Sequence, residues 1–460
     1  MEPKFIIFWA VFLTGIPLGT LLCIRIPFLR YLTLGVMVWC TAEPDLVGIN
    51  FFSREFYRAM TRGIEISLAD LCAWVLFFSL IFDKKIKVYW FPPTFGIYFL
   101  YLFIAIFGWI TAVESLPVSA KATYIPYSQF ETNLYPLFEI TKILRGILVF
   151  WVVANLGRDP KAMRAIIWGL VITVLYLTYI VLRDRYLLGI NRVKATLGHP
   201  NTLATYMALM ATLLFACAVS TREWIKSFFG YLFPAGCAAL CVLMTISRGG
   251  LMAMAAGMGL AFTFLSLRNI SLKNTLLVLL GGVMGTFMLA LAADTLMNRF
   301  FGEQDAASDL EYRGKYNDQA KLMAEDYAWG VGAGNFSAWS FEKYAEIIDE
   351  SLPPGTPPHN LWFLTLGELG WPGLVVFVLF WIRLYQVSIP FVIFERSSIY
   401  HTMACAAVSA TLAGHLQNAL QLGFRQSPLF FLNHICMGMM IAAYWVHKDA
   451  KKANAELPQI

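Results

Sequence analysis

The stretch that decides the fold is 201-NTLATYMALMATLLFACAVS-220, which contains no charged residue. An apolar run of about 20 residues is long enough to cross the hydrocarbon core of a bilayer as an α-helix. Similar runs recur along the 460 residues, of which 58% are hydrophobic and 14% charged. Because hydrocarbon offers no partner to free backbone groups, and the runs are too long and too uniformly apolar for barrel strands, the sequence predicts helical spans.

The predicted fold is an all-α polytopic membrane protein with about 12–13 transmembrane helices. The lower count applies if the first two runs merge or one of them is re-entrant. Residues 1–460 are expected to form a single integral membrane domain, in which residues 294–359 form one long, helical loop on the outer side. The predicted spans are 5–23, 26–42, 66–82, 94–112, 137–156, 164–182, 201–220, 228–246, 250–267, 275–293, 360–382, 401–421 and 428–446.

The basic residues of the short loops fall on one side of the membrane when these spans alternate. The positive-inside rule places that side in the cytoplasm. These loops account for the net charge of +6, and no basic patch interleaved with aromatic residues suggests a nucleic-acid partner. The residues concerned are Arg25, Arg30, Lys84, Lys85, Lys87, Arg158, Lys161, Arg164, Arg222, Lys226, Arg268, Lys273, Arg383, Arg396, Lys448, Lys451 and Lys452.

The eight cysteines lie in or beside apolar spans, and none is spaced as a CxxC pair. Such cysteines are expected to pack as small apolar side chains, so the sequence predicts neither a metal site nor a disulfide framework.

A histidine stands at the boundary between the long outer loop and a span, in 356-TPPHNLWFLTLGELGWPG-373. Asn360 is predicted to begin the helix, which places His359 at the outer interface beside the positive end of a helix dipole. That position favours neutral imidazole, which can accept a proton from a hydroxyl group as a general base. The alternative is an interfacial histidine that only hydrogen-bonds a loop carbonyl.

Three arginines are predicted on the same outer face: Arg192 in GINRVKATLGHPNTLA, Arg248 in TISRGGLMAM and Arg313 in LEYRGKYNDQA. A guanidinium fork matches phosphate oxygens two at a time, so such a set suits a lipid-linked diphosphate. Arg192 and Arg313 are favoured as ligands because they lie in turns rich in Gly, Pro and Asn. Arg248 lies between closely spaced spans and could equally contact lipid headgroups or anchor a helix end.

Further polar residues fall within the predicted spans. Glu139, Lys142 and Arg145 share one helix face near its outer end, where they could floor a diphosphate pocket or satisfy one another. Glu368 is expected to pair with a neighbouring helix. His415 could line an acceptor groove or hydrogen-bond between helices.

Three motifs resemble those of the O-antigen ligase and polymerase superfamily. His359 and Asn360, followed by 370-GWPG-373, resemble its histidine motif. The stretch RVKATLGHPNTLA resembles its Arg, Thr/Gly, Asn-Pro-Asn signature, although His199 stands where Asn is more usual. The stretch YRGKYNDQAKLMAEDYAWGVGAGNF resembles its Arg-led helix and Gly-x-Gly-x-Asn turn. The motifs occur in family order, and the resemblance covers roughly residues 190–445.

The resemblance implies an inverting, metal-independent glycosyltransferase without a cofactor, embedded in the bacterial inner membrane with its active site facing the periplasm. Residues 294–359 would then be a periplasmic loop. The donor would be an undecaprenyl diphosphate-linked glycan, the acceptor lipid A core or a second lipid-linked glycan, and membrane lipids would surround the protein. His359 would deprotonate the acceptor. Arg192 and Arg313 would bind the diphosphate. Further possible substrate-binding residues are Arg248, Arg145, Lys142, Asn360, His199 and Asn201.

Ligation of O-antigen to lipid A core is the favoured activity. A polymerase for O-antigen or exopolysaccharide, or a protein-glycosylating relative, would use the same donor chemistry. A transporter of lipid-linked sugars would instead require charged residues at the bilayer midplane and related halves, and no internal repeat is evident. A non-catalytic scaffold would leave Arg192, Arg313 and His359 unexplained.

Overall fold

The computed structural model describes residues 3–43, 49–51, 63–111, 135–266, 271–276, 279, 282, 303–344, 346, 357–394, 398–419, 422 and 425–455. Within these ranges the chain is helical apart from one short antiparallel strand pair, β1 (Ile49–Phe51) with β2 (Ile64–Ile66). The prediction of an all-α membrane protein is confirmed.

Helices follow one another along the chain and lie at the predicted spans, although α15 and α17 extend beyond the predicted ends at residues 382 and 446. They are α1 (Pro3–Ala10), η1 (Val11–Gly15), α2 (Ile16–Arg25), α3 (Pro27–Cys40), α4 (Leu68–Phe82), α5 (Phe95–Thr111), α6 (Tyr135–Leu156), α7 (Pro160–Leu182), η3 (Arg183–Leu187), α8 (Pro200–Ser220), η4 (Lys226–Leu232), α9 (Phe233–Met244), α10 (Arg248–Ser266), α13 (Glu303–Asp326), α14 (Phe336–Glu342), α15 (Leu361–Phe394), α16 (Ile399–Asn418) and α17 (Ser427–Ala455). The predicted span 275–293 lies almost wholly outside the described residues.

Seven helical segments in the described part of the chain are long and apolar enough to cross a membrane. Three shorter apolar helices, α3, α4 and α5, fall at further predicted spans. The chain is therefore a multi-pass membrane protein. The seven segments are Phe5–Arg25, Pro160–Leu187, Pro200–Ser220, Lys226–Met244, Arg248–Ser266, Leu361–Ile393 and Ser427–Ala453.

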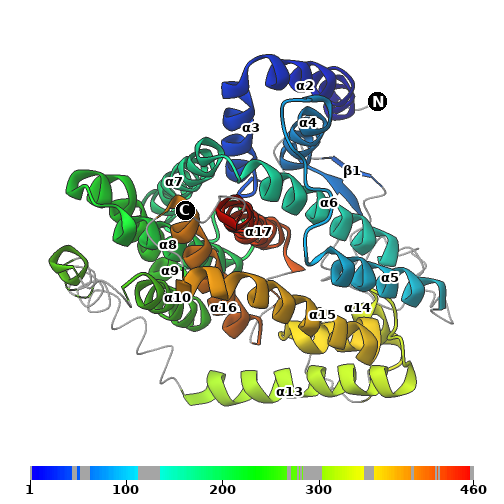
Figure 1. Ribbon diagram of the computed structural model, residues 1–460. Coiled ribbons are helices and arrows are strands. Elements are labelled where there is room, and N and C mark those ends of the chain that lie inside the picture. The colour runs from blue at the N-terminus through cyan, green and yellow to red at the C-terminus, as the bar shows by residue number, and fades with distance from the viewer. Residues whose placement is uncertain are drawn as a thin grey trace.

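Helix α8 forms the centre of the bundle. Every residue from Thr202 to Val219 is buried, as expected for a helix that is apolar around its whole circumference. It packs against α9, α10 and α16, and α17 lies between this group and α6 (Figure 1). The N-terminal segment Phe5–Arg25 is only 17% buried and forms the periphery.

Glycines set the packing of α10 against α8. A Cβ atom on Gly250 would lie 2.6 Å from the Cβ of Ala204. About two helical turns further along α10, Gly257 lies against Thr212. Small residues of this kind let two helix backbones approach closely. Because both contacts advance in the same direction, α8 and α10 run parallel and their N-termini lie at the same end of the bundle.

The long polar loop contains the predicted helix as α13, which packs along α15 at the edge of the bundle (Figure 1). The expected uninterrupted helix through 360–382 is broken at Gly370, which has φ 65° and ψ −171°. The break leaves the carbonyl oxygens of Gly367 and Glu368 free to accept from Val331 N–H at 3.0 Å and Gly332 N–H at 2.9 Å. The glycine-rich turn that follows α13 is thereby docked onto the break in α15.

Candidate functional site

Two predicted site residues cap helices at one end of the bundle. His199 precedes α8, and its Nδ1 atom accepts a hydrogen bond from the backbone N–H of Asn201 at 3.1 Å. Asn360 precedes α15, and its Oδ1 atom accepts from the backbone N–H of Trp362 at 3.0 Å. Side-chain acceptors at these positions satisfy N–H groups that the first helical turn leaves without partners. The prediction that a helix begins at Asn360 is confirmed.

The last turn of α16 brings three helix N-termini together. The side chain of Gln417 borders Gly249 at the start of α10, 3.6 Å from where its Cβ would lie. The ring of His415 lies beside Trp362 at the start of α15, with centroids 5.5 Å apart. Since α8 begins at the same end as α10, residues 199–202, 248–250 and 359–362 form one region, called here the three-helix end. Three positive dipole ends at one place favour an anionic ligand.

Arg192 joins two parts of the three-helix end. Its Nη2 atom donates to Oδ1 of Asn201 at 2.8 Å, and its Nε atom donates to the carbonyl oxygen of Thr245 at 3.4 Å. Thr245 ends α9 and is followed by Ile246, whose φ of 56° is unusual for a β-branched residue. The guanidinium is thus held between the start of α8 and the turn that leads to Arg248. The structure brings Arg192, Asn201 and Arg248 into one neighbourhood.

The electrostatics at His199 reflect this concentration of positive charge. Partial burial, together with nearby Arg192 and Lys194, holds the pKa of His199 below its ordinary value. The imidazole is therefore neutral at pH 7, which agrees with the role of Nδ1 as a hydrogen-bond acceptor. His199 acts as a helix cap in this position, where the family resemblance expected asparagine.

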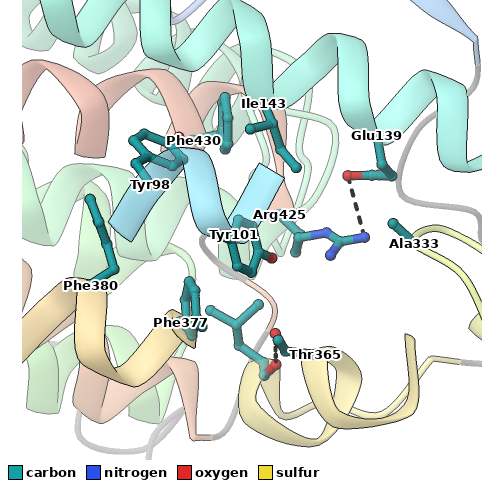
Figure 2. A pocket seen from close by; sticks show the side chains of 11 residues that line it. Tyr98, Tyr101, Glu139, Ile143, Ala333, Thr365, Phe377, Phe380, Arg425 and Phe430 are labelled. Atoms are coloured by element: carbon teal, nitrogen blue, oxygen red, sulfur yellow. Dashed lines mark hydrogen bonds and ion pairs between the residues drawn. The ribbon is translucent and has the colours of Figure 1, made fainter. Parts of the chain in front are cut away.

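Sequence reasoning missed Arg425, which anchors a buried network of charges behind the three-helix end. Its Nη2 atom lies 2.7 Å from Oε2 of Glu368 and 3.3 Å from Oε2 of Glu139. The backbone carbonyl of Arg425 accepts a hydrogen bond from Nζ of Lys142. Figure 2 shows Arg425 and Glu139 facing each other on one side of a small cavity. The expected pairing of Glu368 is confirmed, although its partner comes from the connection between α16 and α17.

That connection also touches the start of α8. Oγ1 of Thr202 donates to Oε1 of Gln426 at 2.6 Å, one residue beyond Arg425. Aromatic rings gather on the far side of the cavity, among them Tyr98, Phe380 and Phe430 (Figure 2). The charge network is therefore connected to the three-helix end through the segment that holds Arg425 and Gln426. Apolar side chains cover its other side.

Arg145 and Lys142, two of the possible substrate-binding residues, have their polar groups directed at protein partners. Arg145 contacts Asp70 through both arms of its fork, Nε to Oδ1 at 2.8 Å and Nη2 to Oδ2 at 2.7 Å. Asp70 in turn accepts from the backbone N–H of Ser67 at 2.7 Å. Lys142 lies 3.9 Å from Glu139 in addition to its bond with the carbonyl of Arg425. Both cations therefore contribute to the scaffold of the bundle.

The remaining two predicted site residues, His359 and Arg313, lie on elements that pack against each other. His359 is half-buried and directly precedes Asn360 at the three-helix end. Arg313 is half-buried on α13, the helix that packs along α15. The structure thus gathers Arg192, Arg248, His199, Asn201, His359 and Asn360 at one end of the bundle, and places Arg313 on the adjoining loop helix.

Residues 233–378 match a family model described as O-antigen ligase. No curated protein matches the chain. The matched segment runs from the start of α9 into α15 and includes Arg248, Arg313 and His359, whereas Arg192 and Arg425 lie outside it. Enzymes of this family are membrane glycan transferases that use lipid-linked glycans. The resemblance is confirmed over residues 233–378, which are similar to the O-antigen ligase family and contain two of the three motifs, those of Arg313 and His359.

Proposed function

We propose that the protein ligates O-antigen, transferring a glycan from undecaprenyl diphosphate to lipid A core at the periplasmic face of the bacterial inner membrane. The match over residues 233–378 supports the transfer of a lipid-linked glycan. The observation that carries the choice of site is the convergence of three helix N-termini, with Arg192 held at the start of α8 and His359 just before α15, at one end of the bundle. The positive-inside rule supports the orientation, since the basic loops lie at the other end of the bundle.

In this proposal the three-helix end holds the diphosphate of the donor. Helix N-termini bind phosphate through backbone N–H groups and the helix dipole, and guanidinium groups add charge-assisted hydrogen bonds. Arg192 is suited to the role because Asn201 and the carbonyl of Thr245 fix its orientation. Arg313 would approach from α13, and Arg248 from the first turn of α10.

His359 would act as the general base. Its imidazole takes a proton from the acceptor hydroxyl as the acceptor oxygen attacks the anomeric carbon from the face opposite the diphosphate. The bond between the anomeric carbon and the phosphate oxygen breaks, and its electron pair stays on that oxygen, where Arg192 and Arg313 stabilise the charge. The anomeric configuration inverts. A positioned base of this kind contributes about 10²–10⁴-fold to a rate.

The test of the acceptor is a transfer assay with purified full-length protein and an undecaprenyl diphosphate-linked glycan. One reaction contains lipid A core, and a matched reaction contains only additional donor. Glycan on lipid A core is the expected result. Lengthened donor chains without product on lipid A core would replace the ligase assignment by a polymerase that uses the same donor site. If neither reaction gives product, the assignment of lipid A core and that of a second lipid-linked glycan as acceptor are both refuted. Transfer is expected to persist in EDTA, since arginines are proposed to stabilise the leaving group.

A further inference from the structure

A second pocket lies at the end of the bundle opposite the three-helix end. It has a volume of about 1450 Å³ and is formed by the C-terminus of α8, the segment leading into η4, residues 271–274, and the junction between α15 and α16. Helix α8 joins the two regions: Asn201 lies in its first turn, and Ser220 at its end lines the pocket. At 1.5 Å rise per residue its 21 residues span about 30 Å, so the pocket is remote from the proposed donor site.

Positive charge dominates the lining. Arg164, Arg222, Lys226 and Lys273 line the pocket, and Glu223 is the one carboxylate among the described lining residues. Within the described part of the chain, none of the four cations makes an ion pair. Like charges gathered in one cavity repel one another, and an anion bound among them relieves that repulsion.

Two helix ends border the pocket. Nζ of Lys273 caps the C-terminus of α8, where it donates to the carbonyl oxygen of Ala218 at 3.1 Å and to that of Thr221 and offsets the negative end of that helix dipole, which leaves Arg164, Arg222 and Lys226 as the cations available to a ligand. The N-terminus of the 20-residue helix α16 also borders the pocket, with Ser398 accepting from the backbone N–H of His401 at 3.1 Å. The dipole of α16 adds to the positive potential.

One lining residue indicates what else the ligand carries. Asn274 is 7% exposed, and its Oδ1 atom has no hydrogen-bond partner among the described residues. A buried acceptor without a partner is costly, and a ligand with a hydroxyl donor would satisfy it. The ligand chemistry is therefore an anion that also bears hydroxyl groups.

The walls of the pocket are aromatic and aliphatic. Trp168 and Trp224, about half exposed at 52% and 51%, line the pocket together with Phe264 and Ile393. Tryptophan is enriched at the level of lipid headgroups, where one side of the ring meets acyl chains and the other meets water. An amphiphile fits this lining better than a free anion.

We propose that this pocket binds an anionic phospholipid whose headgroup carries hydroxyl groups, such as phosphatidylglycerol. The phosphate lies between Arg222 and Lys226, a headgroup hydroxyl donates to Asn274, and the acyl chains run along the apolar wall. The pocket lies on the side where the short loops carry Lys and Arg, which the positive-inside rule places in the cytoplasm. Basic pockets between membrane helices on that side are suited to acidic lipid headgroups. The site is independent of the donor site.

The experiment is native mass spectrometry of the full-length protein, purified in detergent and incubated with phosphatidylglycerol or phosphatidylcholine. Wild-type protein is expected to retain phosphatidylglycerol preferentially. Arg222→Gln with Lys226→Gln should weaken retention about tenfold or more, as expected for the loss of two cations that contact a headgroup. The matched control, Lys84→Gln with Lys85→Gln, removes two cations on the same side but outside the pocket and should leave retention unchanged. Equal weakening in both double variants, or none in the first, would overturn the proposal.

Two further arms identify the ligand chemistry. Millimolar inorganic phosphate is expected to leave phosphatidylglycerol bound. Displacement of the lipid by phosphate would show that the pocket binds free phosphate and not a lipid. Asn274→Leu is expected to reduce retention of phosphatidylglycerol but not of phosphatidic acid, which has no headgroup hydroxyl beyond its phosphate. An equal loss of both lipids would refute the role of Asn274.

Discussion

Replacing Arg425 by methionine should destabilise the protein strongly. The guanidinium lies 2.7 Å from Glu368 and 3.3 Å from Glu139, and none of the three residues is more than 6% exposed. At an effective dielectric constant of about 20, the attraction between Arg425 and Glu368 is about 6 kcal/mol before any desolvation is counted. Methionine keeps much of the side-chain volume but leaves two buried carboxylates, of which Glu139 retains Lys142 at 3.9 Å. The expected loss in the free energy of unfolding is about 3–5 kcal/mol.

The assay is SDS-titrated unfolding of the purified protein in mixed micelles. The matched control is Lys321→Met, because Lys321 also pairs with a carboxylate, Asp318 at 2.7 Å, but the two side chains are 50% and 57% exposed. That variant should lose less than about 1 kcal/mol. The double variant with Glu368→Gln should lose less than the sum of the two single variants, because the residues interact directly. A loss in Arg425→Met no larger than in Lys321→Met would refute the network as a brace of the bundle.

Three further predictions concern the three-helix end and the break in α15. In the same unfolding assay, Gly370→Ala should lower the free energy of unfolding by at least about 1–2 kcal/mol, because φ is positive at this position. Gly259→Ala should leave it unchanged, because the space around the Cβ position of Gly259 is open. Asn201→Ala removes the acceptor that orients Arg192 and should weaken donor binding about tenfold in a titration with fluorescent donor. Unchanged binding would show that Arg192 does not bind the diphosphate. The pKa of His199 is depressed in the folded state, so its contribution to stability is full above the unfolded pKa of about 6.5 and is lost as the pH falls. Between pH 7 and pH 5 the free energy of unfolding should therefore fall in the wild-type protein by about 1 kcal/mol more than it falls in His199→Asn.

Apolar run length was sufficient to predict the helices of the bundle, because the bilayer imposes that length directly. The bounds of α8 differ from the predicted span 201–220 by a single residue. The helix in the polar loop was also predictable, since its pattern lies between turn residues on both sides. The break in α15 was not, because Gly370 lies inside an apolar run and its positive φ depends on a loop that approaches from elsewhere in the chain.

Some residues of the candidate site could also be predicted from local sequence, and others could not. Asn360 and His199 could be found because caps and punctuated turns are local features of the sequence. Arg425 could not be found, since its role depends on Glu139 and Glu368, which are far from it in sequence and come from α6 and α15. Its one signal was a cation in the short connection between two apolar spans. Conversely, Arg145 resembled a ligand in sequence, and only its contact with Asp70 in three dimensions assigns it to the scaffold.

The measurement that tests the central claim most directly is single-turnover glycan transfer by His359→Gln, with donor binding measured on the same preparation. Glutamine keeps hydrogen-bonding capacity at the start of α15 but cannot accept the proton of the acceptor hydroxyl. Donor affinity should remain within about twofold of wild type while the transfer rate falls by about 10²-fold or more. Transfer within a fewfold of the wild-type rate at unchanged donor affinity would contradict His359 as the base, and with it the placement of the reaction at the three-helix end.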